Sequence, residues 1–276
     1  MSAIPVWLRA ALAALAIVAI TSRSTSAAEY QATFELLPSP GFLLVKSLFF
    51  ARDGSAVNVE TASFRRDRVT LRVLDYPDGG PKGAIVLHAM DGGALAAING
   101  GYFTDQYQPD GLLEIAGVVR QPARPGLSGI VGSTTDEDPV IEPVGNADTA
   151  KLRDALQSGP FIVDPGGTNG IRRDDGQRAA RSLVILSPKY IAVSVTARCG
   201  LSDLANALVS TPGTFGVDHV DRALNLDGGP STGFAVRRRN GDVEVVRESA
   251  RLRTVLTVVE RAPSPAPSSS TQPKAP

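Results

Sequence analysis

The feature that most constrains the fold is a series of short apolar runs, each bounded by Gly, Pro, Asp or Asn. The runs are rich in branched and aromatic residues, which pack well on a pleated surface and are typical of β-strands. The predicted strands are 42–50, 69–76, 181–187, 190–196, 243–246 and 253–260. Strands therefore outnumber helices, and several of them are adjacent along the chain.

Two segments have clear helical spacing, and the first is LSDLANALVS at 201–210. Its leucines fall on one face of a helix, and Ser202 or Asp203 is placed to cap its start. A weaker third helix is predicted over 83–91.

The second helical segment is DTAKLRDALQSG at 148–159. Leu152 and Leu156 lie one helical turn apart, and Gly159 follows as a C-terminal signal. A strand over 161–163 is expected to begin after Pro160.

The order of these elements does not alternate strictly between strand and helix. We therefore expect an α+β fold rather than a doubly wound parallel sheet. The prediction is a single domain with a mixed, largely antiparallel β-sheet and two or three helices.

Residues 1–28 have the pattern of a secretory signal peptide, with Arg9, an apolar core at 11–20 and small residues up to Ala28. The apolar core is shorter than the roughly 20 residues that a transmembrane helix needs. We expect cleavage after Ala28, no stable membrane insertion afterwards, and a periplasmic or secreted protein.

The Pro- and Ser-rich segment 262–276 has almost no bulky apolar residues, so we expect a disordered tail. The folded domain is then 29–261. Without the signal segment, the chain has 26 basic and 28 acidic residues. Such a balance gives no electrostatic basis for binding nucleic acid, and any anion site has to be local.

Cysteine and histidine are scarce. Cys199 is the only cysteine and cannot form an internal disulfide, so we interpret it as a small buried apolar residue. His88 and His219 are too scattered for a metal cluster, although His219 could act as a nearby acid or base. The chain has no G-x-S-x-G elbow, P-loop or zinc spacing, so we expect neither a metal nor an organic cofactor.

Two motifs repeat one arrangement, INGG at 98–101 and LDGG at 226–229. In each, an apolar run ends in one polar side chain, Asn99 or Asp227, followed by two glycines. Glycine allows close approach to the main chain, and successive N–H groups in such a turn can form an anion site. The alternative is that each is an ordinary Asn-Gly or Asp-Gly turn.

The residues after the second motif modify this prediction. Pro230 has no N–H, so an anion site has to use the flanking donors. Ser231 and Thr232 then either add hydroxyl groups to the site or complete the turn.

A third candidate region holds four arginines, Arg172, Arg173, Arg178 and Arg181. The planar guanidinium binds phosphate through two parallel hydrogen bonds. Arg181 is the best placed because it enters a predicted strand, whereas the others fit a solvated loop.

The segments INGGYF, QPDGLLEIAG, SGPFIV, RSLVIL, LSDLANAL and NLDGGPST, in this order, resemble the phosphodiester glycosidase family. The resemblance runs from about 94 to 232 and continues toward the strand that ends at Glu260. It implies a hydrolase that cleaves a sugar from a phosphodiester at the anomeric carbon–oxygen bond. The residues that it implies line the cleft are Asn99, Gly100, Gly101, Ser158, Gly159, Arg181, Asp227, Gly228, Gly229 and Ser231. Thr232 is added to these as a further substrate-binding residue.

The chain departs from the family pattern at two positions. Pro230 stands where the family often has glycine, and the family often has another glycine near Ile185, in the segment after Arg181. The first difference is expected to alter the anion site, and the second to change the packing of a strand.

The chemistry of such a reaction suits these residues. A phosphomonoester leaves readily because its second pKa is near 6, so it needs charge neutralisation from Arg181 and the Gly-Gly amides. The oxocarbenium-like centre needs a carboxylate, which we assign to Asp227. The predicted catalytic residues are Asp227, Arg181 and Asn99. Glu114, Asp105 and Asp110 stay open as the second carboxylate.

Two other functions remain consistent with the sequence. One is a noncatalytic carbohydrate-binding protein of the envelope, and Pro230 is compatible with it. The other is a phosphodiesterase that cuts the P–O bond, which usually requires a metal cluster. The expected partner is a sugar-phosphodiester or an envelope or exopolysaccharide glycan.

Overall fold

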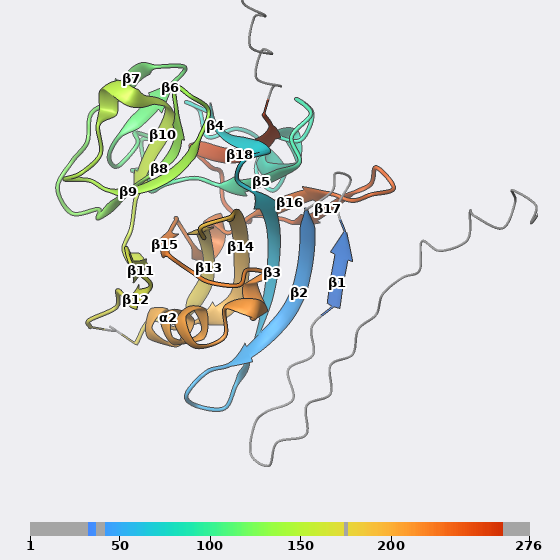
Figure 1. Cartoon of the computed structure of the whole chain (residues 1–276). Coiled ribbons are helices and arrows are strands. Elements are labelled where there is room, and N and C mark those ends of the chain that lie inside the picture. The colour runs from blue at the N-terminus through green and yellow to red at the C-terminus, as the bar shows by residue number, and fades with distance from the viewer. Residues whose placement is uncertain (1–32, 37–41, 174–175, 262–276) are drawn as a thin grey trace, which may run out of the picture.

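The structure, a computed structural model, describes residues 33–36, 42–173 and 176–261. Three β-sheets build it, and every strand pair in this part of the chain is antiparallel (Figure 1). The predicted α+β class with a largely antiparallel arrangement is therefore confirmed. The predicted signal peptide and tail, 1–28 and 262–276, lie outside the described residues.

The first sheet has eight strands and includes the predicted strands 42–50, 161–163, 181–187 and 190–196. Its order is β1 (Thr33–Leu36), β2 (Leu43–Phe50), β3 (Ala56–Arg65), β14 (Tyr190–Cys199), β13 (Ala179–Leu186), β15 (Arg222–Asn225), β11 (Phe161–Asp164) and β12 (Thr168–Asn169). β3 from the first half of the chain and β14 from the second half thus lie side by side in it.

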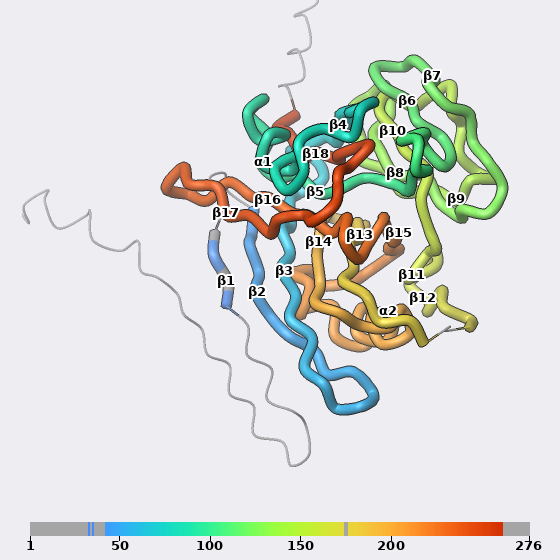
Figure 2. Tube along the Cα trace, turned by 180° about the vertical axis from the view of Figure 1, so that it is seen from behind, coloured from blue at the N-terminus to red at the C-terminus, as the bar shows by residue number. Residues whose placement is uncertain are grey.

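The other two sheets have five strands each. The second has the order β17 (Val243–Val246), β16 (Phe234–Arg237), β5 (Ala96–Asn99), β18 (Thr254–Glu260) and β4 (Val69–Asp75). The third has the order β7 (Val118–Gln121), β6 (Leu113–Ile115), β10 (Leu152–Ser158), β8 (Gly129–Thr134) and β9 (Pro139–Pro143). Figure 2 shows from behind how the C-terminal strands of the second sheet join β4 and β5 from the first half of the chain.

Alternating side chains of the first sheet fill two different cores. In β13, Val184 packs into the core shared with the second and third sheets, whereas Leu183 packs against the helix α2 (Leu201–Ser210). This two-residue period follows from the pleat of the strand. Because both faces are covered, β13 is a rigid support for whatever its ends present.

The helix α2 is confirmed over the predicted range, but neither predicted cap residue caps it. Gly200 stands at the N-cap without a side-chain hydrogen bond. Ser202 and Asp203 instead accept hydrogen bonds from Arg52, from its guanidinium and its backbone N–H respectively. They therefore fasten the loop between β2 and β3 to the helix. The weaker third helix forms as the short α1 (Ile85–His88).

The predicted helix over 148–159 is wrong. A 3-10 turn, Thr149–Lys151, leads into β10, the central strand of the third sheet. Leu152 and Leu156 are four residues apart, an even spacing that fits one face of a strand as well as one face of a helix. Pairing with β6 and β8 buries the strand on both faces and overrides the local helical preference.

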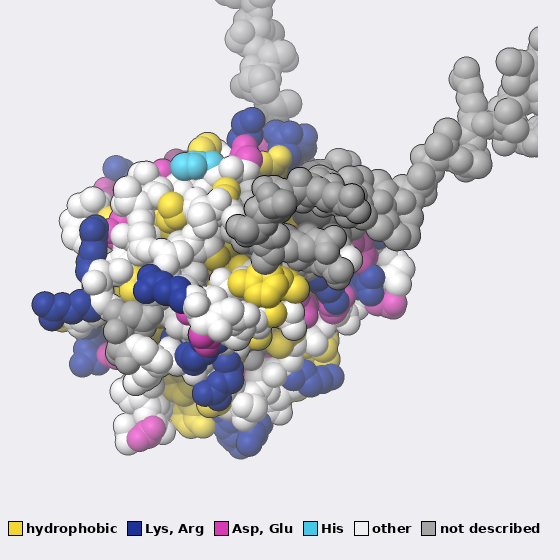
Figure 3. All heavy atoms as spheres, turned by 90° about the horizontal axis from the view of Figure 1, so that it is seen from below, with side chains coloured by type: hydrophobic (Ala, Val, Ile, Leu, Met, Phe, Trp, Pro, Cys, Tyr) yellow, Lys and Arg dark blue, Asp and Glu magenta, His cyan; other side chains and the backbone are white. Residues whose placement is uncertain are grey.

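The face seen from below carries side chains of both charges. In Figure 3 the Lys and Arg side chains are spread over the face seen from below, with Asp and Glu among them. Among the described residues, no helix is long and apolar enough to cross a membrane.

Candidate functional site

The two Gly-Gly motifs lie against each other and are joined by hydrogen bonds. The backbone N–H of Asp227 donates to the carbonyl of Gly100 over 3.2 Å, and the Asn99 carboxamide donates to the carbonyl of Asp227 over 2.7 Å. The first motif ends β5 of the second sheet, and the second motif follows β15 of the first sheet. The site therefore lies at the junction of two sheets, where neither turn is a simple hairpin.

Asn99 is completely buried, and its side chain is fully engaged. Its Oδ1 accepts from the hydroxyl of Ser182 at 2.6 Å and from the backbone N–H of Gly233 at 3.1 Å. Its Nδ2 donates to Asp227, as described above, and more weakly to Gly100 at 3.4 Å. Asn99 therefore holds the turn that contains Asp227, because a buried amide with these partners fixes the backbone around it.

Close packing explains three of the four glycines. A Cβ on Gly100 would lie 2.1 Å from Thr254 Oγ1, one on Gly101 2.7 Å from the carbonyl of Gln157, and one on Gly228 2.8 Å from the carbonyl of Ala180. No side chain fits at these distances.

Gly229 differs, because open space surrounds the position of its Cβ while its φ of +58° favours glycine.

The expectation that the Gly-Gly amides form an anion site is corrected for two of them. The N–H of Gly100 donates to the carbonyl of Thr254, and the N–H of Gly228 donates to the Asp227 carboxylate. The N–H groups of Ser231 and Thr232 are also used, within the 3-10 turn Gly229–Ser231. The sequence pattern shows that a turn is present, but not which of its donors are already satisfied.

The Asp227 carboxyl is half-buried at the entrance of this turn. Burial raises its pKa above the ordinary aspartate value, because a low-dielectric surrounding disfavours the charged form. Hydrogen bonds from the Ser231 hydroxyl and from the Gly228 N–H, the latter at 2.8 Å, lower this pKa because they stabilise the ionised carboxylate. These contacts leave a carboxyl group held by neutral donors rather than by a cation.

Tyr102 and Asn225 connect this turn to the predicted SGP motif. The phenol of Tyr102 donates to the carbonyl of Gly159 at 3.0 Å and accepts from Asn225 Nδ2 at 2.8 Å. Burial, and next the negative charge of Asp227, raise the pKa of Tyr102 to about 12, so its hydroxyl stays neutral. Ser158, next to Gly159, is fully buried and its hydroxyl has no partner among the described residues.

Arg181 lies on β13, directly before Ser182. Its guanidinium donates to the carbonyls of Gln177, at 2.8 Å, and Cys199, at 3.3 Å. Among the described residues, no carboxylate lies within ion-pair distance of it. It is close enough to Tyr102 to lower the pKa of the phenol, against the effect of Asp227. The charges of Arg181 and Asp227 therefore both act on Tyr102, and within the described residues no acid forms an ion pair with Arg181.

The three candidates for a second carboxylate are not contacts of the Asp227 carboxyl in the described part of the chain. Asp110 is paired with Arg124 at 2.8 Å, and Asp105 is exposed. Glu114 is buried beside Asp154 of the third sheet, and burial followed by that neighbour raises its pKa.

The two histidines stand apart from this site as well. His219 is exposed and its ring stands beside Gly167 rather than beside the Asp227 turn. His88 is exposed near Asp91. No group of three His, Cys, Asp or Glu residues within the described ranges could hold a metal ion.

Three residues with a part in this arrangement were not singled out by the sequence reasoning, Ser182, Asn225 and Tyr102. Asn225 stands two residues before Asp227, so a second polar residue in the apolar run before the Gly-Gly motif was a usable signal. Tyr102 directly follows the first Gly-Gly motif. Ser182 carries no local signal, because its contact with Asn99 depends on how two sheets pack.

The sequence model of the phosphodiester glycosidase family matches residues 92–259. The chain belongs to the phosphodiester glycosidase family. This match covers every motif on which the resemblance rested and continues into β18, so the predicted family is confirmed. The matched range begins after β1, β2 and β3, which form one edge of the first sheet.

Solved structures show the same fold at low sequence identity. The catalytic domain of zebrafish N-acetylglucosamine-1-phosphodiester alpha-N-acetylglucosaminidase, auto-inhibited by its pro-peptide, is 16% identical with a TM-score of 0.63, and the alignment covers 84% of this chain and 88% of that one. A hypothetical protein from Synechocystis is 16% identical with a TM-score of 0.54, over 84% of this chain and 68% of that one. A candidate exported protein from Burkholderia pseudomallei is 13% identical with a TM-score of 0.50, over 75% and 74% of the two chains. No curated protein sequence matches the chain.

Proposed function

We propose that this member of the family is an exported hydrolase that cleaves the glycosidic C–O bond of a sugar-1-phosphodiester. Water supplies an oxygen to the anomeric carbon, the bond from that carbon to the phosphate oxygen breaks, and its electron pair leaves with the phosphomonoester. The observation that carries the proposal is the Asp227 carboxyl, half-buried and held by Ser231 and Gly228, at the junction of both Gly-Gly motifs.

Asp227 is the proposed catalytic carboxylate. A carboxylate next to the anomeric carbon stabilises the positive charge that develops as the C–O bond breaks, or acts there as nucleophile or base. Its surroundings support this role, because no cation neutralises the carboxyl within the described residues and its negative charge stays available for the transition state.

Arg181 is the proposed partner of the phosphate. Its donor contacts among the described residues go to backbone carbonyls, so within that part of the chain no acid competes with an anionic leaving group for its charge. Because a phosphomonoester leaves as a stable anion, the site needs this positive charge more than it needs a second carboxylic acid. The absence of Glu114, Asp105 and Asp110 from the contacts of Asp227 in the described structure agrees with this chemistry.

The remaining residues are proposed to shape the site. Asn99 acts as a positioning residue, since its burial leaves it no contact with a ligand. Gly100, Gly101, Gly228, Ser158 and Gly159 form the walls around the two turns. Gly229, Ser231 and Thr232 are the residues of the second turn that lie nearest to a bound substrate.

The cellular place of the reaction is part of the proposal. Two observations support an activity in the periplasm or outside the cell, on envelope or exopolysaccharide material. One is the signal-like segment 1–28, and the other is the structural similarity to a candidate exported protein. After cleavage the enzyme would not stay inserted in the membrane.

The test is hydrolysis of methyl phosphodiesters of several α-sugar-1-phosphates by residues 29–276 in water enriched in oxygen-18. C–O cleavage predicts label in the released sugar and none in the phosphomonoester. Label in the phosphate would show P–O cleavage and contradict the proposal. Saturable binding of the same compounds without any release would identify a noncatalytic binding protein.

A further inference from the structure

A groove with a volume of about 360 Å3 adjoins the Asp227 turn. The 3-10 turn Gly229–Ser231 forms one of its walls, and strands β3, β14 and β17 contribute the others. The lining residues that bear on its chemistry are Glu60, Val195, Pro230, Thr232, Val246 and Arg247.

Strand register places Glu60 in line with the site. Glu60 on β3 is opposite Val195 on β14, and Val195 is opposite Ser182 on β13. Residues opposite each other in antiparallel strands project to the same side of the sheet. The Ser182 hydroxyl donates to Asn99, and the Ser182 backbone carbonyl accepts from the N–H of Leu226, directly before Asp227. Two strand spacings, about 10 Å, therefore separate Glu60 from Ser182, whose backbone and hydroxyl hold the residues around Asp227.

The polar side chains that line the groove are the Glu60 carboxyl, the Asn58 amide, the Arg247 guanidinium and the hydroxyls of Thr196, Thr232 and Ser249. Glu60 is half-buried and hydrogen-bonded to Glu244, which forms an ion pair with Lys46. Oε2 of Glu60 and Oγ1 of Thr232 have no hydrogen-bond partner among the described residues. Unsatisfied oxygens of this kind are costly when buried, and a ligand that supplies a donor relieves the cost.

The remaining lining is largely apolar and does not favour an anion. Val195, Val246 and Pro230 offer aliphatic surface. The lining places the Glu60 carboxyl, and not the guanidinium of Arg181, beside a ligand in the groove. Arg247 stands at the exposed rim and donates to the carbonyl of Gly83 at 2.9 Å. A neutral ligand with hydroxyl donors and C–H faces, such as a sugar ring, fits this combination.

We propose that this groove is the subsite for the sugar of the substrate, with Glu60 and Thr232 accepting hydrogen bonds from its hydroxyl or amide groups. The inference rests on the proposed function and deepens it: the phosphate side of the substrate lies toward Arg181, and the sugar side toward Pro230. Sugar selectivity then depends on residues outside both Gly-Gly motifs, from a strand that precedes the family match.

The experiment measures binding of unphosphorylated methyl α-glycosides of glucose, mannose, galactose and N-acetylglucosamine, and separately of inorganic phosphate, by titration calorimetry. The variants are Thr232→Val, which keeps the shape of the side chain, Glu60→Ala, and Val246→Trp, which fills the groove. Val118→Trp, at an exposed position of β7, is the matched control. Thermal unfolding verifies that each variant is folded.

The proposal predicts about a tenfold weaker sugar affinity for Thr232→Val and for Glu60→Ala, with phosphate affinity unchanged and with Val118→Trp like the parent. Thr232→Ser, which retains a hydroxyl, should recover most of the affinity. No sugar binding by the parent, unchanged sugar affinity in the folded groove variants, or a parallel loss of phosphate affinity would each overturn it. If the parent hydrolyses sugar-1-phosphodiesters and the groove variants bind sugar as the parent does, the subsite is refuted and the proposed function stands. If the parent binds sugar without hydrolysing any phosphodiester, and the groove variants lose that binding, the proposed function is refuted and the sugar-binding groove stands.

Discussion

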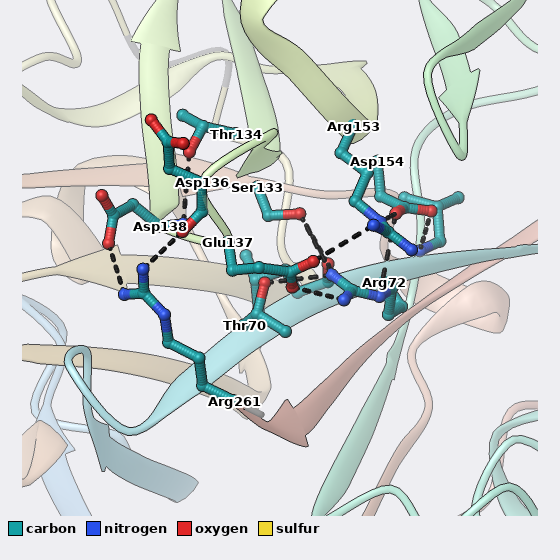
Figure 4. Close-up of polar contacts among 12 residues, drawn as sticks. Thr70, Arg72, Ser133, Thr134, Asp136, Glu137, Asp138, Arg153, Asp154 and Arg261 are labelled. Carbon is teal, nitrogen blue, oxygen red and sulfur yellow. Dashed lines mark hydrogen bonds and ion pairs between the residues drawn. The ribbon is translucent and has the colours of Figure 1, made fainter. Parts of the chain in front are cut away.

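Two regions of this molecule gather polar side chains between sheets, and they are built in opposite ways. At the Asp227 turn, neutral groups do the fastening, with Asn99 bonded to Ser182, Gly233 and the Asp227 backbone. At the junction between β4 and the third sheet, ion pairs between arginine and acidic side chains hold the elements together. There Arg72 contacts Glu137 and approaches Asp154, and Arg153 bridges the same two acids, as Figure 4 shows.

The difference shows which cluster is suited to chemistry. The acids of the Arg72 network are balanced by guanidinium groups, so their charge is committed to joining two sheets. Asp227 has no such counter-ion among the described residues, and its carboxyl is held by an N–H and a hydroxyl. Removing one partner of a buried ion pair leaves an uncompensated charge, so the acids of such a network are committed to their partners. A carboxyl held by neutral dipoles can instead respond to charge that develops in a substrate.

Arg181→Ala, which removes the positive charge that we propose for the site, should cause the largest loss of activity. We expect kcat/KM for a sugar-1-phosphodiester to fall by about 10²- to 10³-fold, as for the loss of one transition-state donor. Arg181→Lys should recover only part, because an ammonium lacks the planar fork. Steady-state kinetics on both variants tests this, and an unchanged kcat/KM in Arg181→Ala would remove Arg181 from the site.

Asn99→Ala should affect both activity and stability. The change leaves the Gly233 N–H without its acceptor and the Asp227 carbonyl without its donor, each costing about 1–3 kcal/mol when buried. Displacement of Asp227 should lower kcat by about 10²-fold, given the sensitivity of catalysis to small misplacements. Kinetics together with denaturant unfolding measures this, and a stable variant with full activity would show that the Asn99 contacts are dispensable.

The pH profile should report the raised pKa of Asp227. If the ionised carboxylate is required, kcat/KM falls on the acidic side, and the midpoint of that fall lies above the ordinary aspartate value of 3.8. Because the native state disfavours the charge, the Asp227 contribution to stability worsens as pH rises through this pKa and is relieved below it. An acidic limb at or below the ordinary value would contradict the assignment.

Glu114→Gln should have the smallest effect and should leave kcat unchanged. Burial and the nearby Asp154 raise the pKa of Glu114, so its ionised form weakens the native state. The variant should have the same or a slightly higher free energy of unfolding at neutral pH, within about 0.5 kcal/mol. The difference should vanish as pH falls through the pKa of Glu114, where the parent is neutral as well. A large loss of kcat in the variant would make Glu114 the missing second carboxylate.

Much of the fold could be predicted from residue composition and the spacing of apolar residues. Runs of β-branched and aromatic residues bounded by turn residues mark strands wherever both faces of the sheet are covered. The failure at 148–159 shows the limit. The Leu152 and Leu156 spacing fits either element, and only the neighbours β6 and β8 decide between them. That information belongs to the tertiary structure and not to the segment.

The motifs of the site could likewise be predicted, but their contacts could not. The adjacency of Asn99 and Asp227 follows from the meeting of two sheets, which no local pattern specifies. The occupied amides of Gly100 and Gly228 escaped prediction for the same reason, since their acceptors are Thr254 on another strand and the Asp227 side chain.

The most direct test of the central claim compares Asp227→Asn with Asp154→Asn, the same chemical change in the two contrasted regions, with the exposed Asp91→Asn as a reference. For each we would measure kcat on a sugar-1-phosphodiester and the free energy of unfolding. The account predicts that Asp227→Asn lowers kcat by about 10³-fold with stability equal to or above the parent, because the amide keeps an acceptor for Gly228 and Ser231 and removes a disfavoured charge. Asp154→Asn should lose about 1–3 kcal/mol of stability and keep its kcat. Full activity in a folded Asp227→Asn, or a loss of kcat confined to Asp154→Asn, would contradict it.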